Sequence, residues 1–346
     1  MPDPNGLRCG QRSCGEKGLD SSPLISIIVL NWNGEEHVHR CLENVLAQDY
    51  RPVEVIVVDN GSVDNSLKRI KSDHRDFVYI ENHKNRGYAA GMNQGIEASH
   101  GDFIVPLNQD VCLDHAFVSQ CVARMQEDST LGAIGGRVYC WMGDELTNRL
   151  RKGEGEQCFM KKRFQSDGGH FTDKPTLTFA PCGSFPFLRR SMLHDLKDAS
   201  GCYYDESYET GWEDCDLWFR MHLLGWKCLF LPPAVGWHVG SGSVGGKASF
   251  FSKALDYQLR VLRNRHYTII KDIPGRTLLW LFPYLTATEF AIIPYFLLRS
   301  PKSLVALVAA WWQVMRDLPV LLRKRAQIQK SKRVNHAYLR QYFVRF

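Results

Sequence analysis

Two short stretches of the chain carry side chains that could hold a charged ligand or accept a proton. The stretch IVPLNQDV (residues 104–111) predicts a buried strand that stops abruptly at Asn108 and Asp110. The stretch WEDCD (residues 212–216) puts three carboxylates at the start of a predicted helix. Carboxylate and amide oxygens bind divalent metals, and a carboxylate within reach of a hydroxyl can remove its proton. The simpler alternatives are an Asx turn in the first stretch and the ordinary preference of acids for a helix N-terminus in the second.

The first hundred residues alternate between strand patterns and helix patterns. Runs of aliphatic residues predict strands, and apolar residues at three- and four-residue spacing predict helices. The predicted strands are residues 24–30, 53–59, 77–80 and 102–107, and the predicted helices are residues 35–48, 64–71 and 88–100. This alternation implies an α/β fold with a mostly parallel, Rossmann-like sheet flanked by helices. Ligands of such sheets bind beyond the carboxyl ends of the strands.

Polar residues follow all four predicted strands. Asn31 and Asn33 follow the first strand, Asp59 ends the second, residues 82–93 follow the third, and Asp110 follows the fourth. Ordinary turn chemistry explains any one of these ends, because Asn, Asp and Gly are common in turns. Turn chemistry explains less well why four successive strands all end in such residues. We therefore expect these residues to meet in one site for a polar ligand.

Charge is distributed unevenly along the 346 residues. The first 246 residues carry 25 Lys and Arg against 33 Asp and Glu, whereas the last hundred carry 18 against 4. An acidic body with a basic tail predicts that the tail meets phosphate, either on lipid headgroups or on nucleic acid. Because nucleic acid would not explain the apolar runs of the tail, we expect a membrane surface and no nucleic acid partner.

The cysteines and two irregular segments complete the composition. The 11 cysteines show no Cys-x-x-Cys motif and no zinc-binding spacing, which favours reduced structural thiols in a cytosolic protein. Residues 1–22 lack the apolar core of a signal peptide and predict a disordered leader. Residues 140–176 are polar and charged, and they predict an irregular insertion or a mobile loop.

Two apolar stretches dominate the C-terminal tail. Residues 277–298 and 303–322 are each about as long as a membrane-spanning helix needs to be. The first contains Glu289, and the second contains Arg316 and Asp317, which are costly inside a bilayer. Aromatic and basic neighbours favour helices that lie in the plane of the membrane interface. The alternatives are a hairpin that spans the membrane, or helices packed on the body or on a second copy in a homodimer.

The order of motifs resembles that of the family 2 glycosyltransferases, whose fold is called GT-A. The motifs are SIIVLNWNG, VIVVDNGSVDNS, NRGYAAGMNQG, VPLNQDV and DESYETGWEDCDLWFRMHLLGW, which together cover roughly residues 24–245. The resemblance is greatest to the bacterial rhamnosyltransferase-like branch. It implies transfer of a sugar from a nucleoside-diphosphate donor to an acceptor hydroxyl, with inversion at the anomeric carbon.

The same resemblance assigns roles to individual residues. It places the following residues at the nucleotide sugar: Asn31, Asn33, Asp59, Asn85, Arg86, Gly87, Asn93, Asn108 and Asp110. Asp59 would read the base, since a carboxylate can accept the imide N–H of uracil or thymine. Asp110 would bind Mg²⁺ or Mn²⁺ beside the diphosphate. The chain departs from the family here, because Asn108 stands where the motif has its first acid.

The second half of the chain receives the remaining roles. The resemblance makes Asp214 the catalytic base and adds His238 as a second metal ligand. We expect Trp212 and Glu213 on the acceptor side, where Glu213 either contacts the acceptor or supports the residues that do. An exposed surface position for Arg86 and a structural role for His238 remain open alternatives. Helical spacing predicts one purely structural ion pair, between Asp216 and Arg220.

The whole pattern predicts an inverting, metal-dependent glycosyltransferase of cell-surface polysaccharide synthesis. We expect residues 23–246 to form the GT-A domain and residues 247–346 a helical, basic, membrane-associating region, on the cytoplasmic inner face of the cell membrane. The expected donor is dTDP-L-rhamnose, with a UDP-sugar next, and the acceptor is a glycan or a lipid-linked glycan. The alternatives are a non-catalytic nucleotide-sugar-binding scaffold and a sugar-phosphate nucleotidyltransferase.

Overall fold

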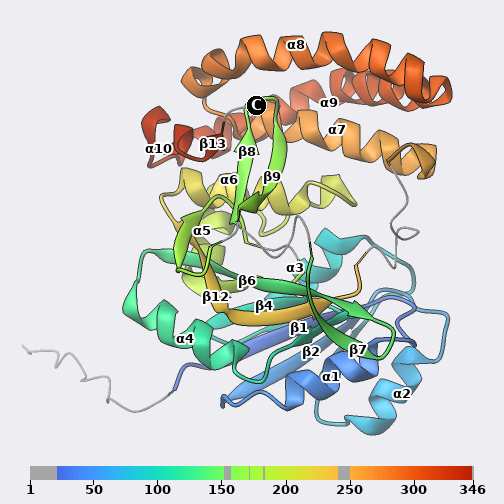
Figure 1. Cartoon of the computed structure of the whole chain (residues 1–346), viewed down its shortest axis with the longest axis vertical. Helices are drawn as coiled ribbons and strands as arrows, with labels where there is room; N and C mark the ends of the chain where they lie inside the picture. The colour runs from blue at the N-terminus through green and yellow to red at the C-terminus, as the bar shows by residue number, and fades with distance from the viewer. Residues whose placement is uncertain (1–21, 152–156, 171, 182–183, 241–249, 345–346) are drawn as a thin grey trace, which may run out of the picture.

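A computed structural model describes residues 22–151, 157–170, 172–181, 184–240 and 250–344 (Figure 1). The predicted leader therefore lies outside the described residues, apart from residue 22. The described chain forms a large sheet covered by helices on both faces and a separate layer of C-terminal helices. In Figure 1 that layer lies at the opposite end of the molecule from helices α1 and α2.

The first half of the large sheet confirms the predicted alternation of strands and helices. Its elements are β1 (Ile25–Asn31), α1 (Val38–Leu46), β2 (Val53–Asp59), α2 (Ser66–Asp73), β3 (Val78–Glu81), α3 (Tyr88–Ala98) and β4 (Phe103–Asn108). The four strands are parallel, with β1 between β2 and β4. Asn31 lies opposite Asp59, and Leu30 lies opposite Asn108. Because parallel strands end at the same edge, their polar ends are neighbours there.

The second half extends the same sheet and makes it mixed. Its elements are β5 (Val111–Leu113), α4 (Phe117–Glu127), β6 (Leu131–Met142), β7 (Glu145–Leu150), β10 (Thr176–Thr178), β11 (Phe187–Arg189), α5 (Arg190–Ser200), η1 (Glu206–Tyr208), α6 (Glu213–Leu223) and β12 (Lys227–His238). The strand order is β10-β12-β6-β11-β4-β1-β2-β3, with β5 paired to β12 and β7 paired to β6. β11 is antiparallel to both of its neighbours, β4 and β6.

Alternation along the buried strands builds two separate cores. In β1, Ile25, Ile27 and Val29 pack with residues of α1, α2 and α4, whereas Ile28 packs with residues of α3, α5 and α6. Successive side chains of a strand point to opposite faces, so an unbroken aliphatic run serves both cores at once. The sheet is thereby held rigidly from both sides, which keeps its polar carboxyl edge in register.

The prediction for residues 140–176 was wrong, because most of this segment is regular β structure. It contains β7 and a hairpin of β8 (Gln157–Lys161) and β9 (Gln165–His170). Strand β8 also pairs in parallel with β13 (Phe343–Val344), nearly at the other end of the chain. A strand that is completed by residues almost two hundred positions away carries little local signal, which explains the error.

The C-terminal helices are α7 (Leu255–Asp272), α8 (Gly275–Arg299), α9 (Leu304–Lys330) and α10 (His336–Arg340), with short turns η3 (Phe250–Ser252) and η4 (Pro301–Ser303). Both apolar stretches of the tail are helices that are long and apolar enough to cross a membrane. Charged side chains nevertheless attach them to the rest of the chain. Glu289 of α8 is paired with Arg265 of α7, 2.6 Å between Oε1 and Nη1, and Lys324 of α9 is paired with Asp205, 2.7 Å between Nζ and Oδ1.

Candidate active site

The ends of β1 and β2 are joined through the side chain of Asn31. Its Nδ2 donates to Asp59 Oδ1 at 2.7 Å and to Ser66 Oγ at 2.9 Å, and both Asn31 and Asp59 are buried. The second oxygen of Asp59 accepts from the backbone N–H of Ser62 at 3.0 Å. Asn33, at φ 50°, accepts from the backbone N–H of Val63 at 2.8 Å. The side chains of the predicted pocket residues Asn31, Asn33 and Asp59 therefore hold the loop after β1 and the loop after β2 together.

Asn60 organises the next loop, and the sequence analysis gave it no role. Its Nδ2 donates to Asn85 Oδ1 at 3.0 Å and to the carbonyl of Gly87 at 3.1 Å, while its Oδ1 accepts from the backbone N–H of Arg86 at 3.0 Å. Asn60 thus holds the predicted residues Asn85, Arg86 and Gly87 beside Asp59. The sequence signal that could have identified Asn60 is its position directly after Asp59, the last residue of β2.

The same loop contacts the second half of the chain. Gly87 has φ 83°, and a Cβ there would lie 2.8 Å from the carbonyl oxygen of Glu209, so only glycine fits. Arg86 lies 3.8 Å from Glu206 between Nη2 and Oε2, and both side chains are largely exposed. The amide of Asn93 exchanges two hydrogen bonds of 2.9 Å with the backbone of Tyr204. Arg86, Gly87 and Asn93 therefore lie where the two halves of the domain meet.

Asp110 and His238 are brought together at the other end of the sheet edge. His238 ends β12 opposite Val111, and its Nε2 lies 3.4 Å from Asp110 Oδ1. The other ring nitrogen, Nδ1, is 2.9 Å from Ser184 Oγ, which orients the ring. Burial acts to raise the pKa of Asp110, but the hydrogen bond and charge of His238 outweigh it, so this pKa lies below its ordinary value.

The residues between β4 and β5 have different roles. The backbone N–H of Asn108 donates to the carbonyl of Ser184 at 3.1 Å, which ties the strand end to the segment that holds His238. The side chain of Gln109 bonds both the N–H and the carbonyl of Trp32, at 2.6 and 3.0 Å. Gln109 is thus a structural clamp, and Asn108 and Asp110 flank it as the predicted ligand-binding positions.

The acidic cluster lies at the N-terminus of α6, after a left-handed residue. Trp212 has φ 75° and stacks on Phe164, with ring centroids 5.6 Å apart. Asp214 Oδ1 accepts from the backbone N–H of Cys215 at 2.7 Å. The predicted pair of Asp216 and Arg220 is confirmed at 2.6 Å, and both residues are buried. The cluster therefore divides into Glu213 and Asp214, and a separate structural carboxylate, Asp216.

Glu213 is a partly buried carboxyl directly beside Asp214. The Oε2 atom of Glu213 is buried, and no described residue bonds to it. Burial, followed by the charge of Asp214, raises the pKa of Glu213 to about 8. Burial and then the charges of Tyr204, Glu213 and Asp214 also raise the pKa of Tyr88, the first residue of α3. Tyr88 directly follows Gly87, so the loop of Asn85, Arg86 and Gly87 and the acidic cluster are neighbours in space.

Stability should depend on pH through Glu213. Because its folded-state pKa is raised above 4.5 to about 8, the folded protein keeps a proton that the unfolded chain releases in this window. The stabilisation is fully present below pH 4.5 and is lost as pH rises to about 8. We expect urea unfolding at a series of pH values to show this loss in wild type and a flatter profile in Glu213→Gln. Identical pH profiles for the two proteins would contradict the assignment.

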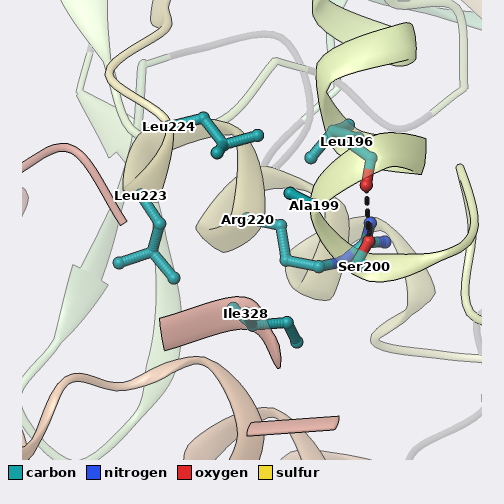
Figure 2. Close-up of a pocket in the computed structure, with 7 residues that line it drawn as sticks. All are labelled: Leu196, Ala199, Ser200, Arg220, Leu223, Leu224 and Ile328. Atoms are coloured by element: carbon teal, nitrogen blue, oxygen red, sulfur yellow. Dashed lines mark hydrogen bonds between the residues drawn. The ribbon is translucent and has the colours of Figure 1, made fainter. Parts of the chain in front are cut away.

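A cavity between α5, α6 and α9 is separate from these groups (Figure 2). It is lined by Leu196, Ala199, Ser200, Arg220, Leu223, Leu224 and Ile328. Its lining is mainly aliphatic, and its one charged group, Arg220, already bonds Ser200 at 3.1 Å and Asp216. None of the predicted site residues contributes to it. We therefore regard this cavity as a packing defect beside the structural ion pair.

Comparison with known proteins places these residues in a family context. Residues 26–196 match the family model described as glycosyl transferase family 2. The chain is 26% identical over 231 residues to poly-beta-1,6-N-acetyl-D-glucosamine synthase of Staphylococcus aureus (strain COL), covering 66% of this chain and 53% of that protein. The synthase of the same name from Staphylococcus epidermidis is 26% identical over 226 residues, covering 64% and 51%. The chain thus spans about half the length of these curated relatives.

Solved structures agree at the level of the fold. S. aureus TarS 1-349 in complex with UDP is similar with a TM-score of 0.56 and 17% identity, over 92% of this chain and 91% of that one. GalNAc-T7 with UDP, GalNAc and Mn²⁺ is similar with a TM-score of 0.58 and 16% identity, over 71% and 47%. At these identities the likeness concerns the fold alone. The family 2 glycosyl transferase model therefore matches residues 26–196, about half of the chain, and the chain has the GT-A fold.

Proposed function

We propose that the protein is an inverting glycosyltransferase that moves a sugar from a nucleoside-diphosphate donor to an acceptor hydroxyl. The observation that carries the proposal is the convergence of strand-end polar groups at one edge of the sheet of this family 2 domain. The loops of Asp59 and Gly87 are bonded through Asn60, and Gly87 contacts the segment that leads to Asp214. A donor bound at this edge would therefore have both a binding pocket and a carboxylate base within one rigid frame.

The donor is a pyrimidine nucleotide sugar in this proposal. The preorganised carboxylate of Asp59 can accept the imide N–H that uracil and thymine share, so it does not separate a UDP-sugar from a dTDP-sugar. Two of the similar structures contain UDP, and another structure of TarS 1-349 contains UDP-GlcNAc. These names favour a UDP-sugar for this chain. The resemblance to the rhamnosyltransferase-like branch keeps dTDP-L-rhamnose as the second candidate.

Asp110 and His238 fit a divalent metal ion whose remaining ligands come from the bound donor. Asp110 and His238 offer one oxygen and one ring nitrogen 3.4 Å apart, and Ser184 fixes the imidazole from behind. Within the described ranges no group of three or more His, Cys, Asp and Glu could hold a metal ion. The diphosphate would therefore supply further ligands, as is common for Mg²⁺. When bound, Mg²⁺ or Mn²⁺ would neutralise the negative charge of the leaving diphosphate.

Asp214 is the base in this proposal, and Trp212 and Glu213 lie on the acceptor side. The acceptor oxygen attacks the anomeric carbon from the face opposite the diphosphate, the bond from that carbon to the phosphate oxygen breaks, and the hydroxyl proton passes to the Asp214 carboxylate. The raised pKa of Glu213 favours its protonated form at neutral pH, which agrees with the assignment of the base to Asp214 in this proposal. Two adjacent carboxyls thus take different roles.

The proposal also includes a location in the cell and a class of acceptor. The curated relatives are polysaccharide synthases by name, and two apolar helices follow the domain in this chain. We place the protein on the cytoplasmic face of the cell membrane, acting on a glycan or lipid-linked glycan acceptor. The eight described cysteines are all free thiols, which agrees with a reducing compartment.

Calorimetric titration with four donors tests the proposal. UDP-glucose, UDP-galactose, UDP-N-acetylglucosamine and dTDP-L-rhamnose are each titrated with and without Mg²⁺ or Mn²⁺. We expect one donor to bind in a metal-dependent manner and Asp110→Ala to weaken this binding at least about 10-fold, because the metal that bridges to the diphosphate loses an anionic ligand. Asp256→Ala, at an exposed acid of α7 with 67% side-chain exposure, is the control and should bind as wild type does. A folded wild-type protein that binds none of the four donors would contradict the donor assignment.

A further inference from the structure

The outer surface of α8 and α9 is apolar and has no partner within the described chain. On α8, Leu279, Phe290 and Leu298 are 75%, 74% and 86% exposed. On α9, Trp312 and Met315 are 69% and 66% exposed. We call the surface formed by these five residues the docking face. A folded chain that leaves so many large apolar side chains in water has a surface that something else covers.

The acidic side chains of both apolar stretches are paired with other residues of the chain. Glu289, the only charged residue between positions 277 and 298, pairs with Arg265 of α7, and its other oxygen lies 3.2 Å from His266 Nε2. Asp317 of α9 accepts a hydrogen bond from Tyr267 and pairs with Arg316. The two acids in the apolar stretches are thus neutralised by partners. The costly charges predicted from the sequence are directed toward α7 or held in a local pair.

Helix α9 is fastened to the body along most of its length. Gln313 accepts from Arg263 at 3.1 Å, Lys324 pairs with buried Asp205, and Gln329 donates to the carbonyl of Asp272 at 2.9 Å. These contacts extend over more than four turns, or about 24 Å of helix at 1.5 Å per residue. A bilayer-spanning α9 would have to break all of them. The helix therefore presents its outer side to a partner while it stays on the body.

The prolines of α8 leave backbone carbonyls of the helix without a partner from within the helix. Pro283 and Pro294 lie inside the helix, and each removes the backbone hydrogen bond to the carbonyl four residues earlier. Those carbonyls belong to Leu279 and Phe290, whose side chains are among the most exposed of the helix. Free carbonyls are costly in a hydrocarbon core but can bond to water and headgroups at an interface.

The charge around the docking face distinguishes a lipid surface from a second copy of the chain. Arg276 and Arg299 flank α8, Lys302 begins the connection to α9, and Arg323 follows on α9; all four are exposed. Two copies meeting through this face would bring like charges together, which is unfavourable. An anionic lipid surface attracts the same residues.

We propose that α8 and α9 lie in the plane of an anionic lipid surface, with the docking face inserted among the acyl chains and the basic residues at the headgroups. The proposal rests on the proposed function only for its biological purpose, which is access to a lipid-linked acceptor. Arg265 links the docking face to the acceptor side, since it binds Glu289 of α8 and donates to the carbonyls of Arg163 and Phe164. Phe164 stacks on Trp212, which directly precedes Glu213.

Vesicle flotation with the full chain tests the proposal. Vesicles contain phosphatidylcholine alone or with 30% phosphatidylglycerol, and binding is measured at low and high salt. We expect wild type to bind the anionic vesicles more tightly, with weaker binding at high salt. The triple variant Leu279→Ser, Phe290→Ser, Leu298→Ser should bind at least about 100-fold less tightly, because each exposed side chain buried in lipid contributes roughly a factor of ten. The control triple variant Leu46→Ser, Met142→Ser, Leu177→Ser removes three apolar residues elsewhere that are 42%, 48% and 44% exposed, and it should bind as wild type does.

Two further measurements separate the possible results. Donor calorimetry on both triple variants should match wild type, so a loss of vesicle binding with intact donor binding is a membrane defect alone. Absence of donor binding in all proteins, with vesicle binding intact, would contradict the proposed function and leave the docking face unaffected. Light scattering tests self-association. A wild-type dimer that the docking-face variant dissociates, or vesicle binding that this variant does not change, would overturn the proposal.

Discussion

Replacing Asp214 by asparagine should lower the rate of sugar transfer by about 10³-fold, the contribution of a positioned general base. The substitution keeps the shape of the side chain, and the amide oxygen can still accept from the N–H of Cys215 as the carboxylate does at 2.7 Å. It removes only the ability to take a proton. We therefore expect kcat to fall while the dissociation constant of the donor stays within about two-fold of wild type, since no charged ligand of the diphosphate is lost.

Glu213→Gln is the matched control for this result. Burial and the neighbouring Asp214 raise the pKa of Glu213 to about 8, so its carboxyl is largely protonated at neutral pH and resembles a neutral amide. The variant should keep most of the activity at pH 7. Initial rates of nucleoside diphosphate release, measured with a membrane fraction as the acceptor, compare the two variants. If Glu213→Gln abolishes transfer and Asp214→Asn preserves it, the roles of the two residues must be exchanged.

Replacing Lys271 by methionine should destabilise the protein by about 3–5 kcal/mol, the usual cost of breaking a buried ion pair from one side. Lys271 is 1% exposed, pairs with Asp205, and lies 2.7 Å from Asp216 between Nζ and Oδ1. Burial acts to lower the pKa of Lys271, but the charges of Asp216 and Asp205 outweigh it and raise the pKa, so the group is charged in the folded protein. Methionine has a similar volume but leaves both carboxylates without this partner.

Lys271 is the centre of an ion-pair network that links three helices. Asp216 belongs to α6, Lys271 to α7, and Lys324 of α9 reaches the same Asp205. Guanidinium unfolding curves should show the loss for Lys271→Met. Lys197→Met is the control, because Lys197 forms an exposed pair with Glu97, and exposed pairs contribute little. Equal unfolding midpoints for wild type and Lys271→Met would show that the buried network does not stabilise the fold.

Local sequence patterns predict the parallel half of the fold well. Residues 53–59 form β2 at the predicted bounds, and the helix predicted to start within residues 212–216 is α6, which begins at Glu213. These elements are readable because aliphatic runs and helical spacing are properties of neighbouring residues. The pair of Asp216 and Arg220 follows from the same helical geometry. The hairpin of β8 and β9 could not be read in this way, since its partner β13 is contributed by Phe343 and Val344.

The sequence pattern identified several candidate residues of the site, but it did not predict the contacts between them. Asp59, Asp110 and the 213–214 pair all follow directly from strand ends or a helix start. Asn60 was missed because its function is to bond Asn85, Arg86 and Gly87, which lie 25 to 27 residues away in another loop. Phe164 was missed because it stacks on Trp212 across the fold. Contacts of this kind depend on the three-dimensional arrangement, which a local pattern does not contain.

The central claim is that this chain transfers a sugar with Asp214 as the base. Its most direct test is to incubate the purified chain with radiolabelled donor, a divalent metal and a membrane acceptor fraction, and to follow label into the acceptor. We predict transfer by the wild-type protein and by Glu213→Gln, and about 10³-fold less by Asp214→Asn with donor binding retained. Equal transfer by wild type and Asp214→Asn would contradict the account, as would the absence of transfer by a wild-type protein that binds the donor.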